Sequence, residues 1–357
     1  MKRLIKLLVI VAGIMLFSVR AEQPVTPNLI NDGPYIFIED NDLRVDWICQ
    51  SKTHSTRVHI ADLPYVFNKC GLYAEVPSLE LLPESTSIKG DFTIAAISDM
   101  HGQYDIMLKL LKNNHIIDKN ARWSFGENHL VVNGDLFDRG PHHTEILWFL
   151  FSLEKQAAAS GGGVHVLLGN HEVFVLNGRE KYLHEKYHLV NRLFNKKYSD
   201  LFTSDTVLGK WLRNKTLLIE ANGSLFVHAG LHPKLIDENV SLSTINQVFT
   251  ESLVKSELEA PRADFAKFLH SSKGPVWYRG YFKGAMAKDT EVDQLLSHFN
   301  VQRIVVGHTS QPHIQTRYGG KVIAIDSSTK YGKYGEVLFI NNDKIWRANL
   351  DGEKMPL

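Results

Sequence analysis

From residue 91 onward, the chain repeats one pattern: a short apolar segment, a polar loop and an amphipathic helical stretch. FTIAAIS (92–98), HLVVN (129–133) and GGGVHVLL (161–168) each indicate a buried strand. Two later strand-to-loop transitions, LFVHAG and IVVGHT, precede the apolar segments VIAIDSS and EVLFINN. This alternation predicts an α/β fold, with helices packed outside a sheet of parallel strands.

The first 90 residues follow other patterns. Residues 1–21 combine the basic start MKRLIK, the apolar run LLVIVAGIMLF and the small residues Val19 and Ala21, which predicts a cleaved export signal. The run is too short to span a bilayer comfortably, so we expect no stable membrane association after cleavage and a periplasmic or secreted protein. Residues 22–90 are rich in Pro, Asn and Asp and predict an irregular N-terminal arm. Residues 91–357 form the predicted catalytic domain, with a helical insertion at about 173–216.

Composition narrows the class of protein. Hydrophobic residues make up 44% and charged residues 22% of the chain, which is typical of a globular protein with a sizeable core. Removal of the predicted signal takes away four of the 40 basic residues and leaves the 39 acidic ones, a net charge of −3. This balance argues against a nucleic-acid-binding surface. The only two cysteines, Cys49 and Cys70, admit either a disulfide or two buried thiols.

Polar residues follow the predicted strands where each strand ends. Because the carboxyl ends of parallel strands meet at one edge, these side chains are expected to converge there. They are Asp99, His101, Asp135, Asn170, His171, His228 and His308.

Aspartate, histidine and asparagine in this arrangement suit divalent metals such as Mn, Fe or Zn. Asp99 and His101 are two positions apart, so both can face one ion from an extended strand end. Asp135 has two oxygens and can bridge two ions. The predicted first ion is held by Asp99, His101 and Asp135, and the second by Asp135, Asn170, His228 and His308. Such a pair holds a hydroxide for direct attack on phosphorus.

Four further residues suit phosphoryl transfer. Arg139 and Arg279 present planar guanidinium groups that match phosphate oxygens. His171 is predicted to be the acid that protonates the leaving oxygen, and Asp138 is predicted to orient its imidazole. Glu172 is expected to brace the turn at GNHE.

The motifs DMH, GDLFDRG, GNHE, HAG and GHT, in this order, resemble the phosphoprotein phosphatase family of metallophosphoesterases. The resemblance covers residues 93 to about 330 and implies a central β-sandwich flanked by helices, with the active site at the carboxyl ends of strands. The family pattern also implies the ligand set given above, residue by residue. The aromatic WYRGY segment resembles the Shewanella-like group, and within it the cold-active protein-tyrosine phosphatase type.

A competing motif is HEKYH at 184–188, which matches the zinc-protease pattern H-E-x-x-H. It lies in a charged helical stretch without an evident third ligand, so we interpret it as a chance match on a helix surface. Asp326 and the aromatic residues of WYRGY admit both a place at the site and a purely structural role.

The predicted function is a binuclear metal-dependent phosphomonoesterase that acts on phosphotyrosine or other aryl phosphates of a phosphorylated protein or small substrate. The alternatives are a phosphoserine/threonine phosphatase, a dinucleoside-polyphosphate hydrolase and, outside enzymes, a pseudoenzyme that serves as a binding module.

Overall fold

The structure of the protein is a computed structural model that describes residues 29–357. The predicted export signal at residues 1–21 and the first residues of the arm lie outside the described residues. Within the described part of the chain, none of the helices has the length and apolar character needed to cross a membrane.

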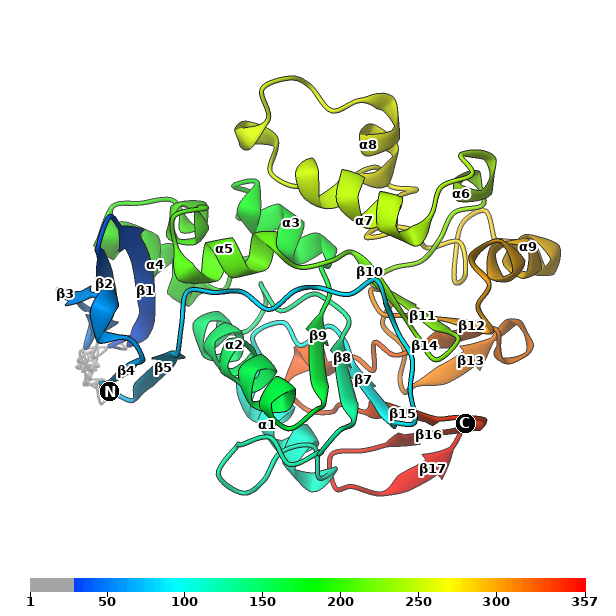
Figure 1. Ribbon diagram of the computed structural model, residues 1–357, viewed down its shortest axis with the longest axis horizontal. Coiled ribbons are helices and arrows are strands. Elements are labelled where there is room, and N and C mark those ends of the chain that lie inside the picture. The colour runs from blue at the N-terminus through cyan, green and yellow to red at the C-terminus, as the bar shows by residue number, and fades with distance from the viewer. Residues whose placement is uncertain (1–28) are drawn as a thin grey trace, which may run out of the picture.

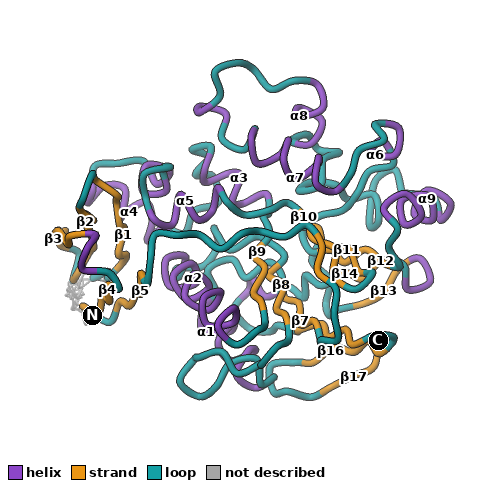
Figure 2. Tube along the Cα trace, viewed as in Figure 1, coloured by secondary structure: helices purple, strands orange, loops and turns teal. Residues whose placement is uncertain are grey.

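Two six-stranded sheets form the centre of the molecule (Figures 1 and 2). In the first sheet, the strands in spatial order are β17 (Lys354–Pro356), β16 (Lys344–Ala348), β15 (Val337–Asn341), β7 (Ile94–Ile97), β8 (His129–Val132) and β9 (Gly163–Val166). In the second sheet, they are β13 (Gln315–Arg317), β14 (Val322–Ala324), β12 (Arg303–Val306), β11 (Ser224–Val227), β10 (Leu218–Ala221) and β6 (Ser87–Ile88).

The two sheets pack face to face. One buried cluster contains side chains of the first sheet, such as Ile94 and Val131, together with Phe226, Val305 and Ile323 of the second. The predicted central β-sandwich is therefore confirmed. Strands β7–β8–β9 are parallel, as are β11–β12–β14, which gives each sheet one edge where several strand ends meet.

The predicted sheet of parallel strands is corrected to two mixed sheets, because hairpins reverse the chain beside both groups of parallel strands. Strands β10 and β11 are antiparallel and are joined through Asn222 and Gly223, both of which have positive φ. Asn-Gly is the favoured pair for this two-residue turn, since both residues tolerate the left-handed backbone. Strand β15 likewise pairs antiparallel with both β7 and β16.

Helices surround the sandwich. Helix α2 packs on the outer side of β9, and α7 contacts β10 of the other sheet (Figure 1). The helices are α1 (Tyr104–Asn113), α2 (His143–Ala159), α3 (Asn170–Leu176), α4 (Glu185–Phe194), α5 (Val207–Arg213), α6 (Lys234–Asp237), α7 (Leu242–Glu251), α8 (Asp264–Leu269) and α9 (Asp289–Phe299).

The prediction of an irregular arm over residues 22–90 is wrong for residues 32–76. This part forms a three-stranded antiparallel sheet and a hairpin, made of β1 (Asp32–Glu39), β2 (Asp42–Cys49), β3 (Lys52–His59), β4 (Tyr65–Lys69) and β5 (Leu72–Val76). Of the Asn and Asp residues that indicated a loop, Asp40 and Asn41 lie in the turn between β1 and β2, whereas most of the others lie within strands. Val45, Trp47 and Ile48 are buried. Cys49 and Cys70 form a disulfide that ties β2 to the hairpin.

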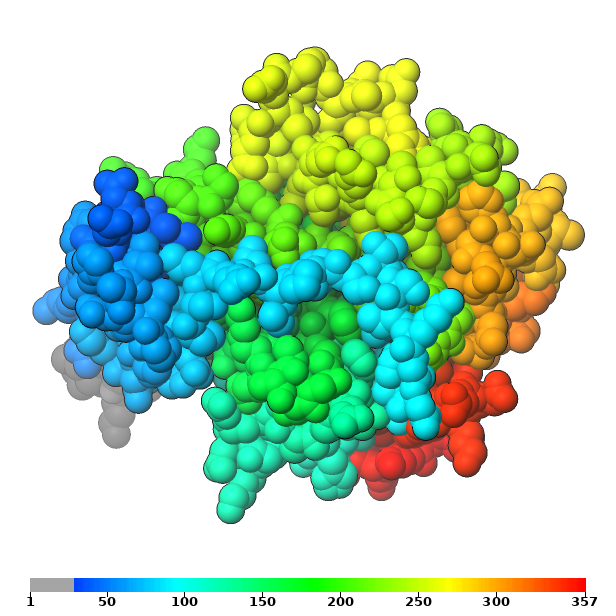
Figure 3. All heavy atoms as spheres, in the orientation of Figure 1, coloured from blue at the N-terminus to red at the C-terminus, as the bar shows by residue number. Residues whose placement is uncertain are grey.

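The predicted helical insertion at 173–216 contains the end of α3, all of α4 and α5, and a 3-10 helix at 198–202. It packs against the N-terminal sheet, where Tyr35 makes edge contacts with the rings of Phe194 and Phe202. From β5, the chain continues as an extended connector that crosses the surface toward the sandwich (Figure 3). Buried Lys215 holds this connector through Glu84 at 2.5 Å and binds Glu154 of α2 at 2.6 Å.

Candidate active site

The strand ends of both sheets converge on one cavity of about 320 Å³, which we call the central cavity. Asp99 follows β7, Asp135 follows β8, and His228 and His308 follow β11 and β12. All these side chains are buried. Five of the six predicted metal ligands line the cavity, and His228 lies behind Asp135 in contact with it.

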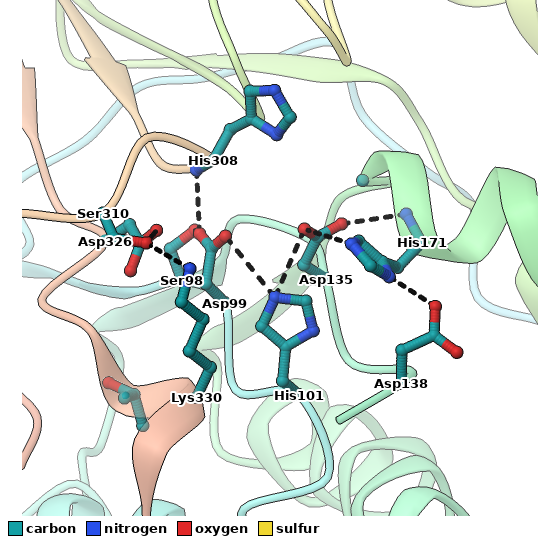
Figure 4. A network of polar contacts seen from close by, with 12 residues as sticks. Ser98, Asp99, His101, Asp135, Asp138, His171, His308, Ser310, Asp326 and Lys330 are labelled. Carbon is teal, nitrogen blue, oxygen red and sulfur yellow. Dashed lines mark hydrogen bonds and ion pairs between the residues drawn. The ribbon is translucent and has the colours of Figure 1, made fainter. Parts of the chain in front are cut away.

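Asp135 occupies the middle of the polar cluster (Figure 4). Its Oδ2 lies 3.6 Å from His101 Nε2 and 3.8 Å from His171 Nε2. Its Oδ1 lies 3.3 Å from Nε2 of His228. Its two oxygens therefore face different sets of imidazoles, which is the arrangement expected of a carboxylate shared between two cations.

The imidazoles are oriented by backbone carbonyls on their far sides. His101 Nδ1 donates to Phe137 O at 2.7 Å, and His228 Nδ1 donates to Asn133 O at 2.8 Å. Both rings thus turn Nε2 toward Asp135. Nε2 of His308 is buried and has no hydrogen-bond partner within residues 29–357. A second nitrogen fixed by a backbone acceptor is typical of histidine ligands to metals, so the donor set fits divalent cations.

Two overlapping groups of side chains can each surround an ion. In each group, one ligand atom per residue lies within 4.8 Å of the others; the groups are His101, Asp135 and His171, and Asp135, His228 and His308. The second group matches the predicted second site. The first group contains His171 where the sequence predicts Asp99. Asp99 Oδ1 still lies 3.9 Å from His101 Nε2, so it remains beside the predicted first site.

The electrostatics of the cluster also favour bound cations. Burial raises the pKa of Asp99 well above its usual range, and the carboxylate of Asp326 adds to the effect. Burial lowers the pKa of His101 to about 3. Burial also disfavours the charged form of His228, but Asp135 and Asp99 outweigh it and raise the pKa to about 10. The carboxylates around His228 thus supply negative charge that favours a cation at this place.

The backbone at this site is strained. Asp99, His101, Asp135 and His308 have φ values of 56°, 45°, 59° and 62°, in the left-handed region that residues other than glycine seldom adopt. Such strain costs about 1–3 kcal/mol per residue and concentrates at functional sites. The sequence did not predict this backbone strain, because none of these residue types requires a positive φ.

Glu172 supports this strained backbone. Its Oε2 accepts hydrogen bonds from the amides of Gly169 at 2.7 Å and Asp135 at 2.9 Å, while Oε1 accepts from Leu136 at 2.7 Å. The predicted brace at GNHE is confirmed, and it extends to the loop that carries Asp135. Gly134 permits the close approach of the two loops, because a Cβ there would lie 2.6 Å from the amide nitrogen of Gly169.

His171 and Asp138 form the predicted pair. His171 Nδ1 donates to Asp138 Oδ2, which leaves Nε2 directed toward Asp135 and the cavity (Figure 4). The His171 amide also donates to Asp135 Oδ1 at 3.0 Å. Burial opposes protonation of His171, but the carboxylates of Asp135 and Asp138 outweigh it and raise the pKa. An imidazole held at the cavity wall with Nε2 directed toward the cavity is suited to proton donation.

The two predicted arginines both line the cavity. Arg139 is exposed, has a left-handed backbone with φ of 68° and stacks over the ring of Tyr182 at 4.9 Å. Arg279 comes from the WYRGY segment and is half-buried, and this burial lowers the pKa of its guanidinium.

Several lining residues were not predicted from the sequence. They are Phe174, Tyr182, Lys283, Thr309, Ser310 and Lys330. Thr309 and Ser310 directly follow His308 in the chain and could have been inferred from that position. The two lysines and Tyr182 lie in segments without a motif, and only the folded chain brings them to the cavity.

The WYRGY segment and Asp326 each admitted a place at the site or a structural role, and the structure distinguishes the two. Of the WYRGY segment, Trp277 and Arg279 line the cavity, whereas Tyr281 is fully buried and bonded to Leu231. Asp326 accepts hydrogen bonds from the Ser310 hydroxyl at 2.6 Å and the Ser328 amide at 3.0 Å and does not line the cavity. Its position is that of a structural carboxylate.

Among the described residues, the histidines of the HEKYH motif have no further metal ligands around them. His184 caps α4, with its Nδ1 accepting from the Lys186 amide at 3.2 Å, and His188 is exposed. Neither belongs to a potential metal cluster of the described residues. The interpretation of the motif as a chance match is confirmed.

Replacement of both His184 and Glu185 by Ala is therefore expected to leave the predicted phosphatase activity and the metal content unchanged. Loss of the cap should lower the free energy of unfolding by about 1 kcal/mol. Activity on an aryl phosphate and thermal unfolding measure the two effects. A large loss of activity would show that α4 contributes to the site directly.

The chain is similar to known phosphatases along most of its length. The pattern of the calcineurin-like phosphoesterase family matches residues 92–312. The chain is 38% identical to the cold-active protein-tyrosine phosphatase of a psychrophilic Shewanella species, with a TM-score of 0.85 over 92% of this chain and 99% of that one. It is 29% identical to Shewanella-like protein phosphatase 1 of Plasmodium berghei over 75% of this chain and 77% of the relative. A shorter match, 31% identical, joins 40% of the chain to 44% of a symmetrical bis(5'-nucleosyl)-tetraphosphatase of Chromobacterium violaceum.

The sandwich, the cavity of carboxylates and imidazoles and the family match together define a metallophosphoesterase, and the chain belongs to the calcineurin-like phosphoesterase family. More narrowly, it is a phosphatase close to the Shewanella-like protein phosphatases. The predicted resemblance and the predicted class of enzyme are confirmed.

Proposed function

We propose that the protein is a binuclear metal-dependent phosphomonoesterase that hydrolyses phosphotyrosine and other aryl phosphates. The observation that carries this proposal is the position of Asp135, whose two oxygens face His228 on one side and His101 and His171 on the other. The similarity to a protein-tyrosine phosphatase over 92% of the chain supports the aryl substrate.

Asp99, His101 and Asp135 would hold one ion, and Asp135, Asn170, His228 and His308 the other. Bound Mn, Fe or Zn ions would lower the pKa of a water molecule and neutralise the charge of the phosphoryl group. Both cysteines are joined in a disulfide outside the cavity, so the chain offers no thiol nucleophile. The proposed hydrolysis is therefore direct and has no phosphoenzyme.

In this proposal, the remaining residues of the cavity act on different parts of the substrate. Arg139 and Arg279 bind phosphoryl oxygens from two sides, while His171 donates its Nε2 proton to the departing phenolate oxygen. Asp138 holds the imidazole in place through its hydrogen bond to Nδ1. Phe174, Tyr182 and Trp277 form an aromatic wall at the cavity, which suits a phenyl ring better than a short alkyl chain.

A panel of substrates tests this function. Metal-loaded protein is expected to hydrolyse phosphotyrosine peptides and p-nitrophenyl phosphate with kcat/KM above the values for phosphoserine and phosphothreonine peptides. Because the chain is partly similar to the bis(5'-nucleosyl)-tetraphosphatase, the panel also includes a dinucleoside tetraphosphate. Faster cleavage of that compound, or of the phosphoserine peptide, would overturn the aryl preference.

We also propose that the protein is exported. The disulfide between Cys49 and Cys70 supports this location, because disulfides persist in oxidising compartments. The mature chain is expected to begin near Glu22 when recovered from the periplasm or the medium, as N-terminal sequencing measures. Recovery of the chain with Met1 from the cytoplasm would contradict export.

A further inference from the structure

A second hollow, with a volume of about 520 Å³, adjoins the central cavity. Phe174 and Trp277 line both spaces, so the two meet at these aromatic side chains. Helix α3 and the residues just after it form one side of the hollow. The chain between α7 and α8, drawn in yellow above α3 in Figure 1, forms the other side.

The hollow is lined by three cationic side chains and by no carboxylate. Arg179, Lys255 and Arg262 supply the charge, and we call the space the basic hollow. Within residues 29–357, none of the three is ion-paired with an acidic side chain. Glu257, two residues from Lys255, is bound instead to Arg213 at 2.5 Å. The positive charge is therefore uncompensated.

The cations are positioned by the fold. Arg262 donates from Nε to Ser252 O at 2.8 Å and from a terminal nitrogen to Leu253 O at 3.0 Å. The guanidinium of Arg179 lies 5.5 Å from the Phe174 ring, which places it beside the wall shared with the central cavity. The Lys255 amide is bound to Asn177 Oδ1 at 2.8 Å, which fixes the backbone of the lysine.

We propose that the basic hollow binds aspartate and glutamate side chains that flank the phosphotyrosine in a peptide segment of the substrate. This inference rests on the proposed function, since the phosphotyrosine occupies the central cavity. A peptide residue spans about 3.3 Å when extended, so neighbours of the phosphotyrosine pass over the shared aromatic wall into the hollow. Fixed guanidinium groups match carboxylates well, and uncompensated cations at the entrance also favour capture of an acidic peptide.

Matched phosphotyrosine peptides test the inference. They have equal length and carry either Glu or Gln at the three positions on each side of the phosphotyrosine. Wild-type protein loaded with metal is expected to prefer the Glu peptide roughly tenfold in kcat/KM, through a lower KM, because three weak surface ion pairs act together. The preference should shrink as salt is added.

Arg179→Gln combined with Lys255→Gln should reduce this preference to less than about twofold, with unchanged activity on p-nitrophenyl phosphate. Both side chains are exposed, so the fold should tolerate the changes. Arg179→Glu combined with Lys255→Glu should reverse the preference toward a peptide with Lys at these positions, because two carboxylates and one guanidinium group would then line the hollow. Lys344→Gln, which removes an exposed charge on β16, is the matched control and should keep the wild-type preference.

Equal kcat/KM of the wild type on the Glu and Gln peptides would overturn the inference, as would an unchanged preference in the double variant. A peptide with a second phosphorylated residue beside the phosphotyrosine is a further comparison. If kcat/KM rose for this peptide but not for the Glu peptide, binding of carboxylates would also be overturned. If the wild type hydrolysed neither p-nitrophenyl phosphate nor any peptide, the proposed function itself would fall. Activity on p-nitrophenyl phosphate therefore distinguishes failure of this inference from failure of the proposed function.

Discussion

Asp135→Asn is expected to abolish turnover and to lower the metal content of the purified protein. The substitution keeps the size of the side chain but removes the charge that faces His101, His171 and His228. Loss of cation binding removes several kcal/mol of stabilisation from the transition state, which corresponds to a decrease of roughly 10³-fold or more in rate. Steady-state kinetics and elemental analysis measure both effects.

Asp32→Asn is the control for this experiment. It also removes a buried negative charge, but Asp32 lies on β1, is ion-paired with Lys186 at 2.7 Å and does not line the central cavity. This variant should retain its metal and most of its activity. Normal turnover and full metal content in Asp135→Asn would refute the assignment of Asp135 as the shared ligand.

His171→Asn is expected to slow hydrolysis of phosphotyrosine by up to roughly 10²–10⁴-fold, the usual contribution of a general acid. The effect should depend on the leaving group. Tyrosine has a pKa of about 10, so its oxygen needs the proton as the bond to phosphorus breaks. Nitrophenolate is much less basic, and the loss on p-nitrophenyl phosphate should therefore be smaller.

Asp138→Asn should give the same dependence in weaker form, because this residue acts through the hydrogen bond to His171 Nδ1. Metal content must be measured in both variants, since His171 Nε2 also lies 3.8 Å from Asp135 Oδ2. Equal losses on both substrates with unchanged metal content would show that His171 binds the phosphoryl group and does not donate the proton.

The order of motifs located much of the candidate site before the fold was known. Asp99, Asp135, His228 and His308 each follow a strand of apolar residues, and parallel strands end at one edge. Their convergence was therefore predictable from local pattern and topology. The strands of residues 32–76 were missed, since their burial depends on the insertion that packs against them.

The sequence by itself determined the α/β pattern and the six candidate ligands, because strand ends and short motifs are local properties of the chain. Only the tertiary structure decided the disulfide, the left-handed backbone at the ligands and the place of Lys283 and Lys330 at the cavity. It alone gathered Arg179, Lys255 and Arg262 around one hollow. These features depend on contacts between segments distant in the chain, and such contacts are set by packing, which no local pattern records.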